Sequence, residues 1–279
     1  MDKYVTKTIP FFDPGKIALS GQAFRIANID DKHTELVAFG RYLQIAKIGD
    51  DKFALSCSEE EFDTIWNRYF HLNFDYLKAI KSIPSTDRYL TEAKDFSYGI
   101  RILRQDPWEA LISYIISQRR SIPSIMTSVE RLSTKCGRRI NVPKTWDTPF
   151  VKPLKDQYYS FPTRQEMSNL TLDEISSLGV GYRAPYIMNA ITCAPDLDAW
   201  NDLPDEDLYN ALTDLKGVGK KVADCVMLFA YGRCGRFPVD VWIGRIQDRY
   251  YGGAFDTTPY PDSAGIMQQF MFFYERCHL

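Results

Sequence analysis

The sequence lacks the marks of several large protein classes. No two of its six cysteines have the CxxC spacing of zinc or iron–sulfur sites, so we expect no iron–sulfur cluster and no metal site. No apolar run approaches the roughly 18 residues that a membrane-spanning helix needs. The N-terminal stretch MDKYVTKTIPFF lacks the charged and then apolar pattern of a secretory signal. We therefore expect an intracellular protein whose cysteines are free thiols.

An excess of positive charge is also absent. The net charge is -2 and the isoelectric point is about 6.0, whereas domains that bind nucleic acids are often basic. Net charge is a weak test, because phosphate binding depends on local positive groups and on backbone N–H donors. With 279 residues, 45% of them hydrophobic, the chain can bury a sizeable core in one large or two fused domains.

The hydrophobic patterns divide the chain into two regions. Residues 34–57 contain period-two stretches interrupted by Gly49-Asp50-Asp51, which predicts a β-hairpin. We expect an α+β fold, with an N-terminal antiparallel sheet domain over residues 1–97 and an all-helical region over 98–279. The predicted helices span residues 59–69, 122–135, 183–194, 205–214, 220–231, 241–250 and 263–276, with another beginning at Asp106.

The start of that last helix carries a strong local signal. In Asp106-Pro107-Trp108-Glu109, Asp is a preferred N-cap, Pro suits the first turn, and Glu stands three residues after the cap. Leu111, Ile112, Ile115 and Ile116 follow at helical spacing, which predicts a buried stripe.

The most informative stretch is the sequence from Leu215 to Cys225, LKGVGKKVADC, which predicts a helix-hairpin-helix at about 205–231. Gly217 and Gly219 allow a tight turn and a close approach to a partner. The second helix then presents unpaired N–H groups, which form an anion site suited to a DNA phosphate. On these residues alone, a DNA-docking hairpin without catalysis is the simpler interpretation.

Two ionisable residues make a catalytic interpretation stronger. Lys221 stands near a helix N-terminus, where the macrodipole and partial burial both favour the neutral amine that attacks carbon. Asp240 precedes an apolar helix and is predicted to be its N-cap, which keeps the carboxylate ionised. Taken singly, Lys221 fits a phosphate contact and Asp240 a simple cap. The lysine followed by the aspartate is a more specific sign of catalysis than either residue alone.

Several longer motifs occur together with this pair. They are LSGQAFR at 19–25, ILRQDP at 102–107, LGVGYRA at 178–184, the hairpin itself, and PVDV at 238–241. With these motifs the chain resembles the helix-hairpin-helix glycosylase superfamily, and within it the 8-oxoguanine DNA glycosylase family. The resemblance covers nearly the whole chain. It implies a bifunctional DNA glycosylase/AP lyase of base excision repair, which flips out and excises 8-oxoguanine from duplex DNA.

The resemblance also implies roles for individual residues. Lys221 matches the nucleophile that forms a Schiff base and Asp240 the essential aspartate. Gly21 matches the glycine whose carbonyl accepts a hydrogen bond from N7–H of the lesion, a proton that guanine lacks. Gln268 and Phe272, four apart on one predicted helix, match residues that read and stack on the base. The last member of the implied base pocket, packing on the other face of the base, is Cys225.

The implied DNA contacts include departures from the family pattern. The contacts are Gly217, Gly219, Lys220, Arg119, Tyr182, Arg183 and Trp242. Arg119-Arg120-Ser121 stands where the family usually has asparagines, and Ser124 stands where it has a second arginine for the orphaned base. Trp242 replaces a phosphate-binding histidine, and Lys216 replaces a proline. These departures put the usual preference for cytosine opposite the lesion in doubt.

The remaining expectations follow from the resemblance. Catalysis should need no cofactor, although a structural monovalent cation at the hairpin is allowed. The partner should be double-stranded DNA containing an oxidised purine, bound by a monomer, in the cytoplasm or nucleoid if the source is bacterial. Alternatives are a non-catalytic helix-hairpin-helix DNA-binding protein, an alkylbase glycosylase, which lacks the lysine, and an iron–sulfur endonuclease, which needs four clustered cysteines.

Overall fold

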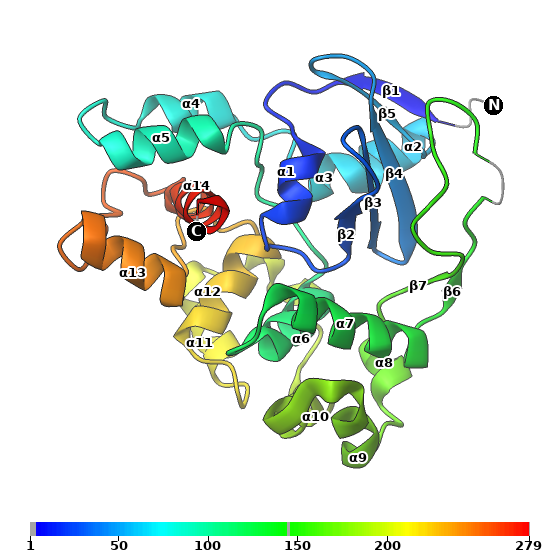
Figure 1. Cartoon of the computed structure of the whole chain (residues 1–279). Coiled ribbons are helices and arrows are strands. Elements are labelled where there is room, and N and C mark those ends of the chain that lie inside the picture. The colour runs from blue at the N-terminus through cyan, green and yellow to red at the C-terminus, as the bar shows by residue number, and fades with distance from the viewer. Residues whose placement is uncertain (1–3, 144–145, 279) are drawn as a thin grey trace.

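A computed structural model describes residues 4–143 and 146–278, and combines an antiparallel sheet with a larger helical part (Figure 1). The strands are β1 (Val5–Thr8), β2 (Ile26–Asn28), β3 (His33–Ala38), β4 (Arg41–Lys47), β5 (Lys52–Leu55), β6 (Arg139–Ile140) and β7 (Tyr158–Tyr159). The α-helices are α1 (Pro14–Leu19), α2 (Glu59–Glu61), α3 (Asn67–Tyr69), α4 (Tyr76–Lys81), α5 (Arg88–Phe96), α6 (Pro107–Ser117), α7 (Ile122–Cys136), α8 (Arg164–Met167), α9 (Leu172–Ile175), α10 (Ala184–Cys193), α11 (Asp205–Thr213), α12 (Lys220–Phe229), α13 (Val241–Tyr250) and α14 (Ala264–Cys277). The α+β class predicted from the sequence is confirmed.

The five-stranded sheet has the order β1-β5-β4-β3-β2, with every neighbouring pair antiparallel. The predicted hairpin is present between β4 and β5, where the N–H of Ile48 donates to the carbonyl of Lys52 at 2.9 Å. A second hairpin joins β3 to β4 at Phe39-Gly40, where both residues have positive φ angles. Nothing in the sequence pattern predicted this second turn.

One hydrophobic core lies between the sheet and the helical stretch 59–69. That stretch is continuous, because a turn of wider helix over 62–66 joins α2 to α3 as predicted. Trp66 and Phe70 pack there with Ile45 and Phe53 of the sheet, and none of these side chains is exposed.

The helix that begins at Asp106 forms the centre of the helical part. The carboxylate of Asp106 accepts a hydrogen bond from the N–H of Glu109 at 2.8 Å, so the predicted cap of α6 is confirmed. The predicted apolar stripe of α6 is completely buried. This rigid helix carries the loop 118–121 at its C-terminal end, which becomes important for the site.

The expected boundary between residues 97 and 98 does not coincide with the hydrophobic cores. Helix α5 lies before that boundary but packs on α14, and Leu90 shares a core with Phe270. The segment containing β6 and β7 lies after the boundary but returns to the sheet, where Tyr158 donates to the carboxylate of Glu35 at 2.5 Å. The two parts of the chain are therefore interleaved, because each has apolar surface that the other covers.

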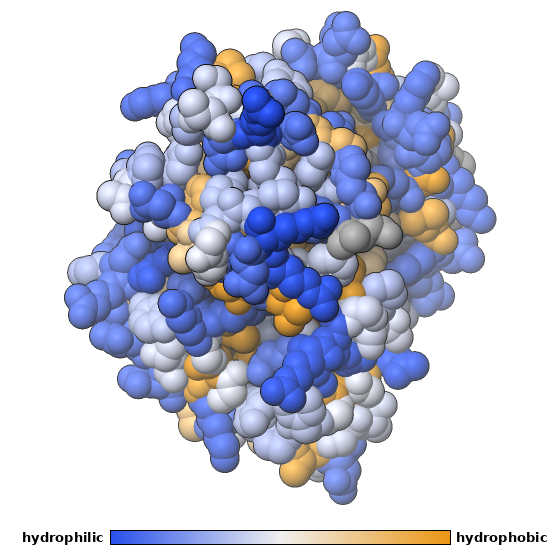
Figure 2. Space-filling view, turned by 60° about the vertical axis from the view of Figure 1, so that its left-hand side comes forward, coloured by the Kyte–Doolittle hydropathy of each residue, from blue (hydrophilic) through white to orange (hydrophobic). Residues whose placement is uncertain are grey.

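The face of the molecule seen in Figure 2 is mainly polar. Hydrophilic side chains cover most of the face in Figure 2, and apolar side chains reach that surface only in small separate groups. Among the helices of the described ranges, none is both long and apolar enough to span a bilayer.

Candidate active site at the helix-hairpin-helix

A pocket of about 650 Å³ opens where the starts of α12 and α13 face the loop before α7. The C-terminal helix α14 and the turn after α1 complete its wall. With Tyr182, which precedes α10, the pocket therefore draws on six segments that are far apart in the sequence. Its lining residues are Gly21, Phe24, Tyr114, Ser117, Gln118, Arg119, Arg120, Ser121, Ile122, Pro123, Ile125, Tyr182, Gly219, Lys220, Lys221, Val222, Asp240, Val241, Trp242, Phe272 and Arg276.

The predicted helix-hairpin-helix is present, with α11 and α12 joined by residues 214–219. Gly219 is the N-cap of α12, and no side chain caps the first turn. The N–H groups at the start of α12 are thus left for another partner, and the helix dipole favours an anion there. The turn itself is braced from α6, because the side-chain amide of Gln118 donates to the carbonyl of Gly217 at 3.1 Å.

The two hairpin glycines have different physical roles. Gly217 has a φ of +88°, and a Cβ atom there would lie 2.3 Å from the ring of Tyr186. Gly219 has a φ of -94°, and no heavy atom lies within 4 Å of the position a Cβ would take. Gly217 is therefore required by the fold, whereas Gly219 leaves open space in front of the helix.

We predict that Gly217→Ala destabilises the protein by about 1–3 kcal/mol, because the substitution combines a left-handed backbone with a steric clash. Gly219→Ala is the matched control and should unfold at the wild-type temperature. Thermal unfolding followed by circular dichroism compares the two variants. Equal melting temperatures for Gly217→Ala and the wild type would contradict this assignment.

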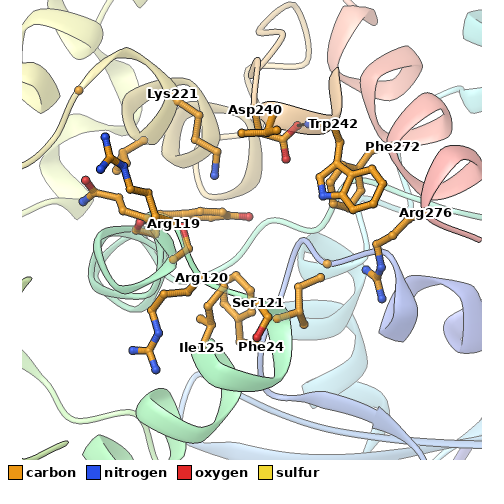
Figure 3. A pocket seen from close by; sticks show the side chains of 18 of the residues that line it. Phe24, Arg119, Arg120, Ser121, Ile125, Lys221, Asp240, Trp242, Phe272 and Arg276 are labelled. Carbon is orange, nitrogen blue, oxygen red and sulfur yellow. Dashed lines mark hydrogen bonds between the residues drawn. The ribbon is translucent and has the colours of Figure 1, made fainter. Parts of the chain in front are cut away.

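Lys221 lies in the first turn of α12 and is half-buried, as expected. Its side chain points into the pocket (Figure 3), and its Nζ lies 5.3 Å from the centre of the Tyr114 ring. Cys225 lies one turn further along the helix and is buried. Burial raises the pKa of the Cys225 thiol, while the charge of Lys221 and its hydrogen bond to the thiol oppose that rise.

Asp240 is the N-cap of α13, as predicted. Its Oδ1 accepts hydrogen bonds from the N–H groups of Trp242 at 3.0 Å and Ile243 at 2.9 Å. Figure 3 shows its carboxylate directed into the same pocket as the amine of Lys221. Both groups also act electrostatically on the Cys225 thiol, in opposite directions. The fold thus brings together the amine and the carboxylate that the sequence singled out.

Gly21 and Phe272 line another part of the pocket wall. Gly21 has a φ of +75°, and a Cβ atom there would lie 2.8 Å from Ile122 and 3.2 Å from the Phe272 ring. The backbone of Gly21 therefore lies close to an aromatic face with no room for a side chain. Arg276 also lines this wall and donates to the carbonyl of Leu19 at 2.8 Å. None of the sequence motifs pointed to Arg276, although it lies four residues after Phe272 on the same helical face.

Two residues expected in the base pocket lie behind its wall instead. Cys225 and Gln268 are both buried, and neither lines the pocket. The side-chain amide of Gln268 donates to the carbonyl of Pro238 at 3.2 Å and accepts from Gln269 at 3.2 Å. These two bonds use one of the two N–H groups and one of the two lone pairs of the Gln268 amide.

Arg119 and Arg183, which are expected near the orphaned base, and Arg120 between α6 and α7 differ in how far other protein groups engage them. Arg119 has a φ of +52° and is exposed at the pocket. Arg120 folds back, donating to Ser128 Oγ at 3.0 Å and to the carbonyl of Gly179 at 2.9 Å. Arg183 is buried and donates to the carbonyl of Val180 at 3.1 Å.

Two aromatic residues expected to touch DNA lie at the pocket edge. Tyr182 is 54% exposed, and the buried guanidinium of Arg183 supports its ring from 4.3 Å. Trp242 is half-buried, with the guanidinium of Arg245 5.8 Å from its ring. With Lys220 and Gly219, these residues form a rim of aromatic, cationic and N–H donor groups.

Comparisons with known proteins agree with this arrangement. Residues 5–111 match the family model described as 8-oxoguanine DNA glycosylase, N-terminal domain. The N-glycosylase/DNA lyase of Saccharomyces cerevisiae is 34% identical over 75% of this chain, which spans 55% of that longer protein. The probable N-glycosylase/DNA lyase of Methanothermobacter thermautotrophicus is 30% identical, over 68% of each chain.

A solved structure is similar over the whole chain. The 8-oxoguanine glycosylase/lyase of Clostridium acetobutylicum, in a complex with DNA containing cytosine opposite 8-oxoguanine, is 29% identical. It superimposes with a TM-score of 0.89, over 100% of this chain and 97% of that one. From its motifs, its fold and these relatives, the chain belongs to the 8-oxoguanine DNA glycosylase family.

Proposed function

We propose that this protein is a DNA glycosylase with AP lyase activity, which excises 8-oxoguanine from duplex DNA during base excision repair. The observation that carries the proposal is the convergence of Lys221 and Asp240 in one pocket, at the start of the hairpin's second helix. The names of the relatives support the same activity. The pocket is also large enough for a flipped purine nucleoside.

DNA binding would rest mainly on the hairpin and the pocket rim. A phosphate would accept hydrogen bonds from the free N–H groups at the start of α12, with Lys220 beside it. The damaged nucleotide would leave the helix at a cost of about a few kcal/mol. Tyr182 and Arg119 would occupy the space left in the base stack, and Trp242 would contact the backbone.

Inside the pocket, Gly21 would present its carbonyl to N7–H of the lesion while Phe272 stacks on the base. Guanine has an acceptor at N7, so it would leave this carbonyl unpaired. Contacts from Gln268 and Cys225 would require their surroundings to shift on binding, since both are buried.

The chemistry would use one amine twice. The lone pair on Nζ of Lys221 attacks C1′ of the deoxyribose, the C1′–N9 bond breaks, and the electron pair of that bond leaves with the base. Asp240 stabilises the positive charge that develops on the sugar. The anionic base takes one proton from the nitrogen. The C1′–O4′ bond then breaks, O4′ takes the second proton, and a Schiff base results. Removal of a C2′ proton then expels the 3′ phosphate by β-elimination.

The experiment that tests this function is borohydride trapping on duplex DNA with a single 8-oxoguanine. Borohydride reduces the Schiff base to a stable amine, so a covalent protein–DNA complex should form together with free base and nicked strand. Duplex binding without base release or adduct would favour the non-catalytic alternative. Base release from alkylated DNA alone would favour the alkylbase alternative.

We predict weak dependence on the base opposite the lesion. Arg120 and Arg183 are engaged by the protein, and Ser124, which stands where the family has an arginine, accepts a hydrogen bond from Arg120 at 2.9 Å. Since a good bidentate contact is worth about 1–3 kcal/mol, excision rates opposite C, A, G and T should fall within about tenfold. Single-turnover rates on four duplexes measure this. A several-hundredfold preference for C would refute it.

Three finer points belong to the same proposal. The protein would act as a monomer on chromosomal DNA, hence inside the cell and, if the source is bacterial, in the cytoplasm or nucleoid. A structural monovalent cation at the hairpin would be held by backbone carbonyls such as those of Leu215 and Gly217. Each of these two carbonyl oxygens already accepts one hydrogen bond and keeps a second lone pair for the cation. A melting temperature that depends on K⁺ at constant ionic strength would support that site.

A further inference from the structure

Tyr114 joins two parts of the pocket that have separate chemical tasks. It lies on α6 and its ring lines the pocket, 5.3 Å from Nζ of Lys221. Its hydroxyl donates to the backbone carbonyl of Gln22 at 2.8 Å. Gln22 directly follows Gly21. A single side chain therefore contacts both the proposed nucleophile and the turn that carries the proposed base-reading carbonyl.

The turn around Gly21 is held mainly through its neighbour Gln22, whose side chain is buried. The Gln22 side chain accepts from the N–H of Leu103 at 2.7 Å and donates to the carbonyl of Arg101 at 2.9 Å. Its backbone carbonyl accepts from Tyr114 and from Gln105, the latter at 2.7 Å. Among these partners, Tyr114 is the residue that also lines the pocket.

The ring of Tyr114 is itself fixed. It stacks on Phe229 of α12 with centroids 5.8 Å apart, and it meets Phe24 edge-to-face at the same distance. Burial raises the pKa of Tyr114 well above its usual range, so the hydroxyl remains a donor. The ring is therefore held by packing on two aromatic side chains, and the hydroxyl by its hydrogen bond to the Gln22 carbonyl.

We propose that Tyr114 is a positioning residue that couples base reading at Gly21 to the nucleophile Lys221. Its hydroxyl holds the Gly21 turn where the carbonyl meets the lesion, and its ring sets the direction of the amine. This inference rests on the function proposed above, and deepens it by naming the side chain through which the two tasks are linked.

Tyr114→Phe separates the two contacts, because it removes the hydroxyl and keeps the ring. The Gln22 carbonyl still accepts from Gln105, so no buried acceptor loses all its partners and the fold should persist. Single-turnover excision of 8-oxoguanine should fall about tenfold, the scale of one lost hydrogen bond. Strand cleavage at a preformed abasic site needs no base reading, so it should stay within about twofold of wild type.

Tyr231→Phe is the matched control. Tyr231 is equally buried outside the pocket and donates to the carbonyl of Leu197 at 2.9 Å, which also accepts from the N–H of Trp200. This variant should keep both activities. Tyr114→Leu removes the ring as well and should slow both activities, with circular dichroism to verify folding.

The coupling is overturned if Tyr114→Phe excises 8-oxoguanine at the wild-type rate, or if it loses both activities equally. Unchanged abasic-site cleavage in Tyr114→Leu would likewise contradict the role given to the ring. A wild-type protein inactive on both substrates would contradict the proposed function itself. Failure of the proposed function can therefore be distinguished from failure of the role given to Tyr114.

Discussion

Replacing Lys221 by glutamine will abolish both base excision and strand cleavage, with at least about a thousandfold loss of rate. Both steps need a nucleophilic nitrogen at the same place, and a glutamine amide is not a nucleophile. Glutamine resembles lysine in length and helix propensity, so α12 should form as before. Borohydride trapping on 8-oxoguanine DNA, with base release measured in parallel, records the two losses together.

Lys220→Gln is the control for this variant. Lys220 is the adjacent lysine, in the same helical turn and at the rim of the same pocket, but it is exposed where Lys221 is half-buried. Its replacement should weaken DNA binding and reduce the salt dependence of affinity by about one phosphate contact. It should still form the covalent adduct. An adduct of normal yield in Lys221→Gln would refute the proposed nucleophile.

The second large effect is expected at Asp240. Asparagine is about as good an N-cap as aspartate, so Asp240→Asn can keep the hydrogen bonds to the N–H groups of Trp242 and Ile243. What it removes is the negative charge that faces the sugar. Removing one electrostatic stabiliser of a transition state typically lowers the rate about a hundredfold to a thousandfold. We expect the excision rate of Asp240→Asn to fall by at least about a hundredfold.

Comparing two substitutions separates charge from capping. Asp240→Asn should melt close to the wild-type temperature and bind lesion DNA at least as tightly, because a negative charge near phosphates is gone. Asp240→Ala should lose the same activity and, in addition, about 1 kcal/mol of stability from the missing cap. Single-turnover excision within threefold of wild type in Asp240→Asn would show that its charge has no catalytic role.

Local rules explain what could be predicted from the sequence. The caps at Asp106 and Asp240 and the hairpin at Gly217 depend on a few neighbouring residues, and these features are present at the expected positions. The boundaries of the predicted helices agree closely for the same reason, because capping and apolar period depend on residues within one or two turns. The helices α1, α4, α5, α8 and α9 were not predicted.

Other features depend on contacts between distant segments. The sequence does not show that Arg120 would fold back onto Gly179 or that Arg183 would be buried, since both look like exposed cations. The left-handed conformation of Arg119 is set by the loop between α6 and α7, not by its own preference. No sequence pattern indicated the role of Tyr114, because the residues it contacts, Lys221 and Gln22, are about a hundred residues away along the chain in either direction.

The central claim is that a particular nitrogen forms the bond to the sugar, and peptide mapping of the borohydride-reduced adduct tests this claim most directly. After nuclease and protease digestion, mass spectrometry should find the sugar remnant on the side chain of residue 221. A remnant on Lys220, on Lys216 or on the N-terminal amine would contradict the account.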